Sequence, residues 1–248
     1  MLRLRSLGCV SCLAAIFGLV STSPAAVIFS STSGSLAAQA QLVVSGSGAG
    51  RQLKITLSNT STNDVLVPAD VLTALFFNVV GGTFSFTPVS GALDGGSSVV
   101  FEAPPFGGSD IGGEWVYEEG LIGVYANNPT VDRGVSTAGF AIFGPSGVFP
   151  GPDRNSQVAP DGLDYGLLSA GDNTATGNTP VTGGNPLIQS SVVLVLSVPA
   201  AFDESNIDPT NFNFQYGTAL SEPFHPPEPT VMGPLGLACL MCLRRLRR

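Results

Sequence analysis

The sequence predicts an all-β protein with a single domain of the β-sandwich or jelly-roll type. Along the 248-residue chain, apolar residues repeatedly occupy every second position, and this period is typical of strands that bury one face. Charged residues make up only 11% of the chain, and 31 glycines and 19 prolines interrupt it. This composition favours short strands joined by turns over surface helices.

The individual strands are predicted from the same pattern. Clear alternation of apolar and polar residues predicts strands over 38–44, 53–57, 84–86 and 212–216. Residues 192–196 are all apolar, which is typical of a strand at the centre of a sheet. Further strands are expected over 72–79, 97–101, 114–118, 136–142 and 163–168.

Long segments rich in glycine, proline, aspartate and asparagine lie between the expected strands. They cover residues 104–113, 144–161 and 170–186. Loops of this length are the places where a β domain carries binding residues. The shorter glycine-rich stretch 46–50 lacks the spacing of a nucleotide-binding loop and precedes an expected strand, so it is interpreted as a turn.

The body of the chain, residues 27–222, is strongly acidic. It holds four basic and 17 acidic residues, a net charge of −13. Such a surface repels phosphate backbones, which argues against nucleic acid as a partner. The only cysteines are Cys9, Cys12, Cys239 and Cys242, and all lie outside the body. The body therefore has neither a disulfide framework nor a cysteine-based metal site.

Residues 1–26 have the three parts of a secretory signal peptide. Two arginines come first, an apolar run follows over 7–20, and small residues end the segment. Cleavage is expected after Ala25 or Ala26. The apolar run of 14 residues is shorter than the roughly 20 that a membrane-spanning helix needs, which favours a cleaved signal over an anchor.

The C-terminal end also has three parts. A proline-rich linker over 223–230 holds Pro227, Glu228 and Pro229. The segment 231–248 follows, with 13 apolar residues that are expected to form a short hydrophobic helix, and then a basic end. A basic cluster directly after an apolar run keeps that end in the cytoplasm. The cluster consists of Arg244, Arg245, Arg247 and Arg248.

This order of tripeptide, apolar run and basic end resembles the PEP-CTERM sorting signal of exosortase-dependent proteins. The resemblance covers about the last 22 residues and the N-terminal signal that such proteins also carry. It implies export through the Sec machinery, cleavage by a signal peptidase, transient anchoring in the inner membrane by the C-terminal segment, and processing by an exosortase. The implied source is a Gram-negative bacterium that makes exopolysaccharide, and the implied destination is the cell surface or the extracellular matrix.

Few residues of the body point to catalysis. His225 is the only histidine, and we expect it in the extended linker, where nothing would position an imidazole. Glu118 and Glu119 are adjacent, so on a strand they point to opposite faces. Glu102 and Glu114 could act as a pair only if the tertiary structure brought them together. We therefore predict no catalytic residue and no enzymatic activity.

A few loop aspartates and strand aromatics are candidates for metal and sugar binding. Asp161, Asp164 and Asp172 lie in the long loops and are candidate calcium ligands, although aspartates in loops more often cap turns. No other metal or cofactor is predicted. Trp115 and Tyr117 share one face of an expected strand and could stack on sugar rings, but a lone tryptophan more often fills the core.

The expected function is that of an exported, exosortase-processed surface or matrix protein with a structural or adhesive role in the exopolysaccharide layer. One alternative is an exported domain that binds or hydrolyses polysaccharide. A cleft lined by two carboxylates and exposed aromatic residues would favour it. Another alternative is an adhesin stabilised by calcium, whose melting temperature would rise with calcium.

Overall fold

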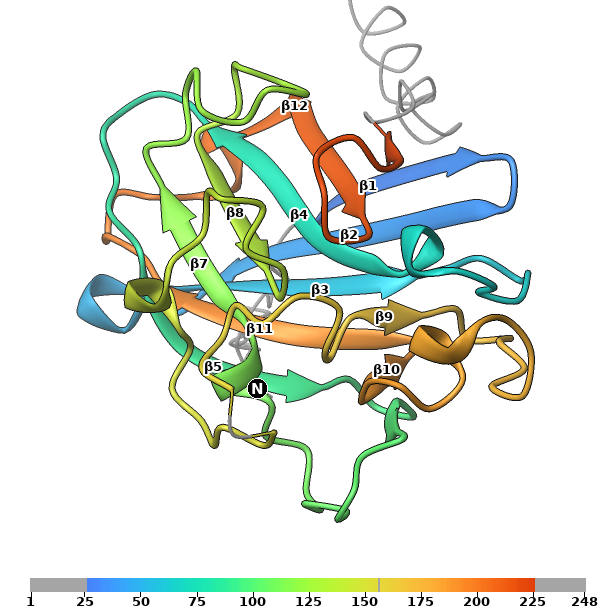
Figure 1. The fold of residues 1–248 in the computed structure, drawn as a ribbon. Coiled ribbons are helices and arrows are strands. Elements are labelled where there is room, and N and C mark those ends of the chain that lie inside the picture. The colour runs from blue at the N-terminus through green and yellow to red at the C-terminus, as the bar shows by residue number, and fades with distance from the viewer. Residues whose placement is uncertain (1–25, 156, 226–248) are drawn as a thin grey trace, which may run out of the picture.

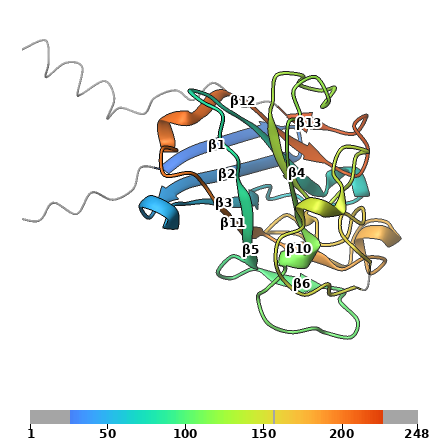
Figure 2. The ribbon, with the colours of Figure 1, turned by 90° about the vertical axis from the view of Figure 1, so that its left-hand side faces the viewer.

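The computed structural model describes residues 26–155 and 157–225, and it has two β-sheets packed face to face (Figures 1 and 2). The predicted all-β sandwich is confirmed. Within the described ranges the helical elements are 3-10 turns of three residues each, and none is long and apolar enough to cross a membrane. The expected signal helix up to Ala25 and the C-terminal helix lie outside these ranges.

The first sheet has five strands in the order β1-β2-β3-β11-β5, and all neighbours are antiparallel. Its residues alternate between core and surface, and Leu42, Ile55 and Leu194 lie side by side in register with no exposed area. The strands are β1 (Ala26–Ser33), β2 (Leu36–Ser45), β3 (Gln52–Asn59), β5 (Thr87–Leu93) and β11 (Ser191–Ser197).

The second sheet follows the order β13-β12-β4-β9-β10-β6, and β8 and β7 extend from β4. Its pairs are antiparallel except β9 with β10. The strands are β4 (Leu72–Val79), β6 (Ser98–Val100), β7 (Val116–Glu119), β8 (Arg133–Ser136), β9 (Leu167–Leu168), β10 (Leu187–Gln189), β12 (Ile207–Tyr216) and β13 (Phe224–His225).

The main core fills the space between the sheets, where the rings of Phe29 and Phe212 lie 3.8 Å apart. A second apolar cluster covers the opposite face of β4, where Phe76 stacks on Tyr125 at 3.8 Å. Strand β4 is thus buried on both faces, which explains its nearly continuous apolar sequence. Loops, not helices, cover the outer face of the second sheet.

Several predicted strands differ from the observed ones. Residues 84–86 form no strand, although Phe84 and Phe86 are buried as the alternation predicted. The strand predicted over 136–142 is wrong: β8 ends at Ser136, and the chain turns at Phe140, where φ is 49°. Strand β1 was not predicted, because its core positions are Phe29 and Ser31 while Ile28 faces outward.

The predicted linker also begins later than expected. Phe224 and His225 form β13 and pair with Gln215 and Phe214 of β12. The imidazole of His225 packs edge-on against the ring of Tyr216 at 5.7 Å. The prediction of an extended linker over 223–230 is therefore wrong at Phe224 and His225, and His225 belongs to the sheet.

Candidate functional site

A buried ion pair between Arg154 and Glu102 forms the centre of the candidate site. The guanidinium donates from Nε to Glu102 Oε1 at 2.6 Å and from Nη2 to Oε2 at 2.8 Å. The side chains are only 2% and 9% exposed. Two parallel charge-assisted hydrogen bonds of this kind fix both groups in direction as well as in position.

Glu102 accepts two further hydrogen bonds. They come from the hydroxyl of Tyr165 at 3.1 Å and from the backbone N–H of Phe106 at 2.7 Å. Burial alone would raise the pKa of Glu102, but the hydrogen bonds and the charge of Arg154 outweigh it and lower the pKa below its ordinary value of 4.5. Glu102 is therefore ionised at neutral pH and holds four donors in place.

Glu114 also contacts Arg154, but through the backbone and not through the guanidinium. Its protonation state is the opposite of that of Glu102. It ends the 3-10 turn Gly112–Glu114 before β7, has no exposed area, and accepts the backbone N–H of Arg154 at Oε1. Its Oε2 has no partner among the described residues. Burial, with the nearby charges of Asp161 and Asp153, raises the pKa of Glu114 to about 8, so the group is protonated at neutral pH.

Two glycines allow this arrangement. A Cβ on Gly112 would collide with the carbonyl of Pro150, and one on Gly113 would collide with the carbonyl of Pro152. The turn that carries Glu114 and the loop that carries Arg154 can therefore approach backbone to backbone only because both residues are glycine.

The calcium candidates are only partly brought together. Asn155 donates from Nδ2 to Asp161 Oδ2 at 2.6 Å and to Asp164 Oδ2 at 2.8 Å. Burial raises the pKa of Asp161 to about 6. Asp172 contacts neither carboxylate and accepts the backbone N–H of Val65 at 2.7 Å, which caps a loop. Across 26–155 and 157–225, no three acidic, histidine or cysteine side chains are arranged to hold a metal ion.

A cavity of about 290 Å³ opens beside the ion pair. Its walls include Phe101, Glu102, Arg154, Tyr165 and the backbone of Gly183 and Gly184, but not Glu114. Phe101 and Tyr165 have φ values of 63° and 57°. Bulky side chains rarely adopt this left-handed conformation, and residues held in it often lie at binding sites.

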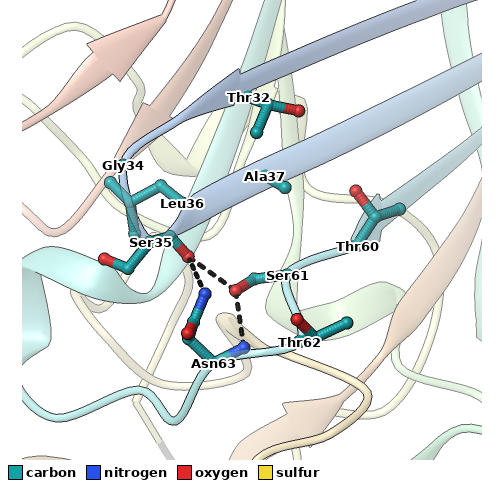
Figure 3. A pocket seen from close by; sticks show the side chains of 9 residues that line it. All are labelled: Thr32, Gly34, Ser35, Leu36, Ala37, Thr60, Ser61, Thr62 and Asn63. Atoms are coloured by element: carbon teal, nitrogen blue, oxygen red, sulfur yellow. Dashed lines mark hydrogen bonds between the residues drawn. The ribbon is translucent and has the colours of Figure 1, made fainter.

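A second hollow, of about 380 Å³, lies at the tip of the β1–β2 hairpin (Figure 3). Segment 60–63 closes it by hydrogen bonds to the turn, among them Ser61 Oγ to the carbonyl of Ser35 at 2.6 Å. Asn63 donates to the same carbonyl at 3.3 Å. Its lining has hydroxyls and one amide but no charged side chain, so it offers weaker recognition than the cavity beside Arg154.

The other predicted residues have structural roles. Trp115 and Tyr117 are buried in the main core between the sheets, which is the usual place of a lone tryptophan. Glu119 accepts hydrogen bonds from Arg133 at 3.2 Å and from Tyr117 at 3.0 Å. Arg133 also donates to the carbonyl of Phe84 at 2.6 Å, so this network connects β7 and β8 to the chain before β5.

The predicted sorting residues Pro227, Glu228 and Pro229 and the arginine cluster 244–248 lie outside the described residues, as does Ala25. Ala26, the second candidate for the cleavage position, is the first residue of β1.

No motif or spacing in the sequence indicates Arg154, Asn155 or Tyr165 as site residues. One signal was present: Arg154 is one of only four basic residues in a body with 17 acidic ones, so an ion pair was to be expected. Which carboxylate it binds depends on contacts 52 positions apart in the chain.

The fold and the cavity define an all-β sandwich domain with a charge-lined cavity among its loops. Comparison with protein-family models, with curated protein sequences and with solved structures found no match to this chain.

Proposed function

We propose that the chain is an exported, exosortase-processed surface or matrix protein with a structural and adhesive role, and that it contacts exopolysaccharide through the cavity beside Arg154. Two independent features support the proposal. The termini carry a signal peptide and a tail that resembles the PEP-CTERM signal. The domain between them is a β-sandwich with a polar cavity formed by loops.

The cavity beside Arg154 is the observation that carries the binding role. Sugar hydroxyls form hydrogen bonds with carboxylate and guanidinium groups that are held in fixed positions, and the C–H faces of sugar rings pack on aromatic rings. Glu102 already accepts four hydrogen bonds and holds the guanidinium in place, Arg154 supplies the guanidinium N–H groups that neither Glu102 nor the carbonyl of Asp110 engages, and Phe101 supplies a ring in the wall. Ligand sites commonly combine a few fixed polar groups with apolar walls in this way.

A binding role fits better than hydrolysis. A glycosidase needs two carboxyl groups that both reach the scissile bond. Glu102 lines the cavity, but Arg154 occupies both of its oxygens, and Glu114 is buried outside the lining. We therefore propose that the ion pair recognises the ligand and does not transfer protons to it.

Phe101→Asn tests the binding role. Asparagine tolerates the left-handed conformation, so the variant should still fold, while the ring is lost from the cavity. Binding of the exported protein to exopolysaccharide from the producing strain should weaken about tenfold or more. Phe224→Ala, which removes a 39% exposed ring on β13, is the matched control and should bind as the wild type does. Equal binding by all three proteins would refute the assignment.

The sorting role has a separate test. The intact mass of the exported protein, measured in the presence of an exosortase, should correspond to a chain that begins near Ala26 and ends near Pro229. A mass that still includes Arg244–Arg248 would contradict processing. This outcome is independent of whether the cavity binds sugar, so the two parts of the proposal can fail separately.

The calcium-stabilised adhesin is a second candidate, favoured by one contact. Asp161 Oδ2 and Asp164 Oδ2 both accept from Nδ2 of Asn155, so the two carboxylates lie near each other around a donor that calcium would have to displace. Calcium prefers such oxygens together with amide and backbone carbonyls. The melting temperature should rise with calcium in the wild type and not in Asp161→Asn. An unchanged melting temperature in the wild type would exclude this candidate.

A further inference from the structure

Among the described residues, β1 has a hydrogen-bonded neighbour on one side only. β1 is an edge strand whose eight residues pair with β2 in one continuous register, without a bulge. Among the described residues, no backbone hydrogen bond joins 26–33 to anything other than β2. At about 3.3 Å per residue, this edge presents roughly 26 Å of strand.

The other edges of the two sheets are protected. At β5, the N–H of Leu93 donates to the carbonyl of Ser109 at 2.8 Å and the N–H of Ile111 donates to the carbonyl of Gly91 at 3.0 Å, so segment 109–111 covers residues 91–93 of this edge. β7 carries Glu118 and Glu119. β6 and β13 have three and two residues. Covering, charge and short length are the usual ways in which proteins prevent edge-to-edge pairing, and β1 has none of them.

The groups that β1 presents follow from its turn. Gly34 and Ser35 form a two-residue hairpin loop, so Ser33 and Leu36 exchange hydrogen bonds and the following pairs alternate. Ile28, Ser30 and Thr32 therefore direct their N–H and C=O groups outward, toward a missing neighbour. Their side chains lie on the exposed face of the sheet, where Ile28 is 46% exposed.

The charge distribution along the chain favours a second copy of this chain as the partner of β1. Residues 26–50 contain no charged side chain, whereas the body as a whole carries −13. Two copies of so acidic a domain repel each other over most of their surface, and the uncharged β1 edge is a place where they can meet without bringing like charges together. Figure 2 shows β1 at one end of the first sheet and β5 at the other, so a copy bound at β1 stays clear of the covered edge.

We propose that β1 is a homotypic interface, at which two copies of this chain pair their β1 strands antiparallel about a two-fold axis at Ser30, so that Ser30 lies opposite Ser30 and Ile28 opposite Thr32. The two five-stranded sheets then form one continuous ten-stranded sheet. A strand edge of this kind is self-complementary, because each copy offers the other the same alternating donors and acceptors. The pairing would present two cavities on one assembly and thereby strengthen attachment to a repetitive polymer.

Sedimentation velocity of the exported chain over a range of concentrations tests the pairing. The wild type should be a dimer that dissociates on dilution. Ser30→Lys places like charges opposite each other at the edge and should weaken association about tenfold or more. Ser90→Lys makes the same charge change on the exposed face of the covered strand β5 and should leave association unchanged. A monomeric wild type, or equal dissociation of both variants, would overturn the proposal.

A cysteine pair tests the geometry separately. Residues 27–222 contain no cysteine, so Ser30→Cys introduces the only thiol of the domain. On a non-reducing gel, Ser30→Cys should give more covalent dimer than the wild type, and Ser90→Cys should not. A dimer that forms in sedimentation but is not trapped at Ser30 would place the interface elsewhere and refute the β1 assignment. A complex of unequal subunits would show that the edge binds a different chain.

Discussion

Glu114→Gln should make the domain more stable at neutral and alkaline pH. Glu114 is fully buried, and its Oε2 has no partner among the described residues. Burial, with Asp161 and Asp153 nearby, raises the pKa of Glu114 from 4.5 to about 8. Glutamine keeps an oxygen for the N–H of Arg154 and cannot ionise, so it mimics the protonated acid.

The sign and size of the effect follow from this shift. The pKa of Glu114 is higher in the folded state than in the unfolded state, so the folded protein binds more protons between pH 4.5 and about 8. The free energy of unfolding therefore falls as pH rises through that window. A shift of one pKa unit corresponds to about 1.4 kcal/mol, so by pH 7 the wild type should have lost on the order of 3 kcal/mol that Glu114→Gln retains.

Urea unfolding at several pH values from 4.5 to 8.5 measures this difference. The stability difference between Glu114→Gln and the wild type should be small at pH 4.5 and grow toward pH 8. Glu204→Gln, in a half-exposed 3-10 turn, is the control and should follow the wild type at every pH. If the two glutamine variants had the same pH profile, the burial argument for Glu114 would be refuted.

Two further predictions concern the ion pair of Arg154 with Glu102 and the imidazole of His225 on β13. Arg154→Met leaves the buried carboxylate of Glu102 without its partner and should lower the free energy of unfolding in urea at pH 7 by about 3–5 kcal/mol. The double variant with Glu102→Gln should recover part of this loss. A decrease below about 1 kcal/mol for Arg154→Met would contradict the buried geometry. Burial lowers the pKa of His225 below 6.5, so the unfolded state binds the proton more readily, and stability should fall as pH drops below 6.5. His225→Gln should reduce that acid dependence, and an unchanged profile would show that the imidazole is not buried against Tyr216.

Much of the fold could be predicted from local patterns. Alternation located β2, β3 and the second half of β12, and the continuous apolar stretch located β11 between two neighbours. The pattern failed where a buried side chain does not belong to a paired strand. Phe84 and Phe86 enter the core from an irregular segment, and apolar residues after Ser136 fill a turn above β4. Burial and strand pairing are separate consequences of tertiary structure, and alternation reports only burial.

The candidate site could be predicted only in part. The long loops were expected to carry binding residues, and Asp161 and Asp164 were among the candidates. Glu102 and Glu114 were named as a pair that only the tertiary structure could bring together, and both now contact Arg154. The left-handed conformation of Phe101 and Tyr165 left no signal in the sequence, because non-glycine residues adopt it only under constraint from their surroundings.

The sequence by itself determined the β class, the acidic and cysteine-free body, and the expectation of export and sorting, because these depend on composition and on contiguous segments. The tertiary structure alone decided the ion pair of Arg154 with Glu102, the protonated state of Glu114 and the open edge of β1. These properties arise from contacts between residues far apart in the chain, from burial that changes the cost of charge, and from which strand is left without a neighbour.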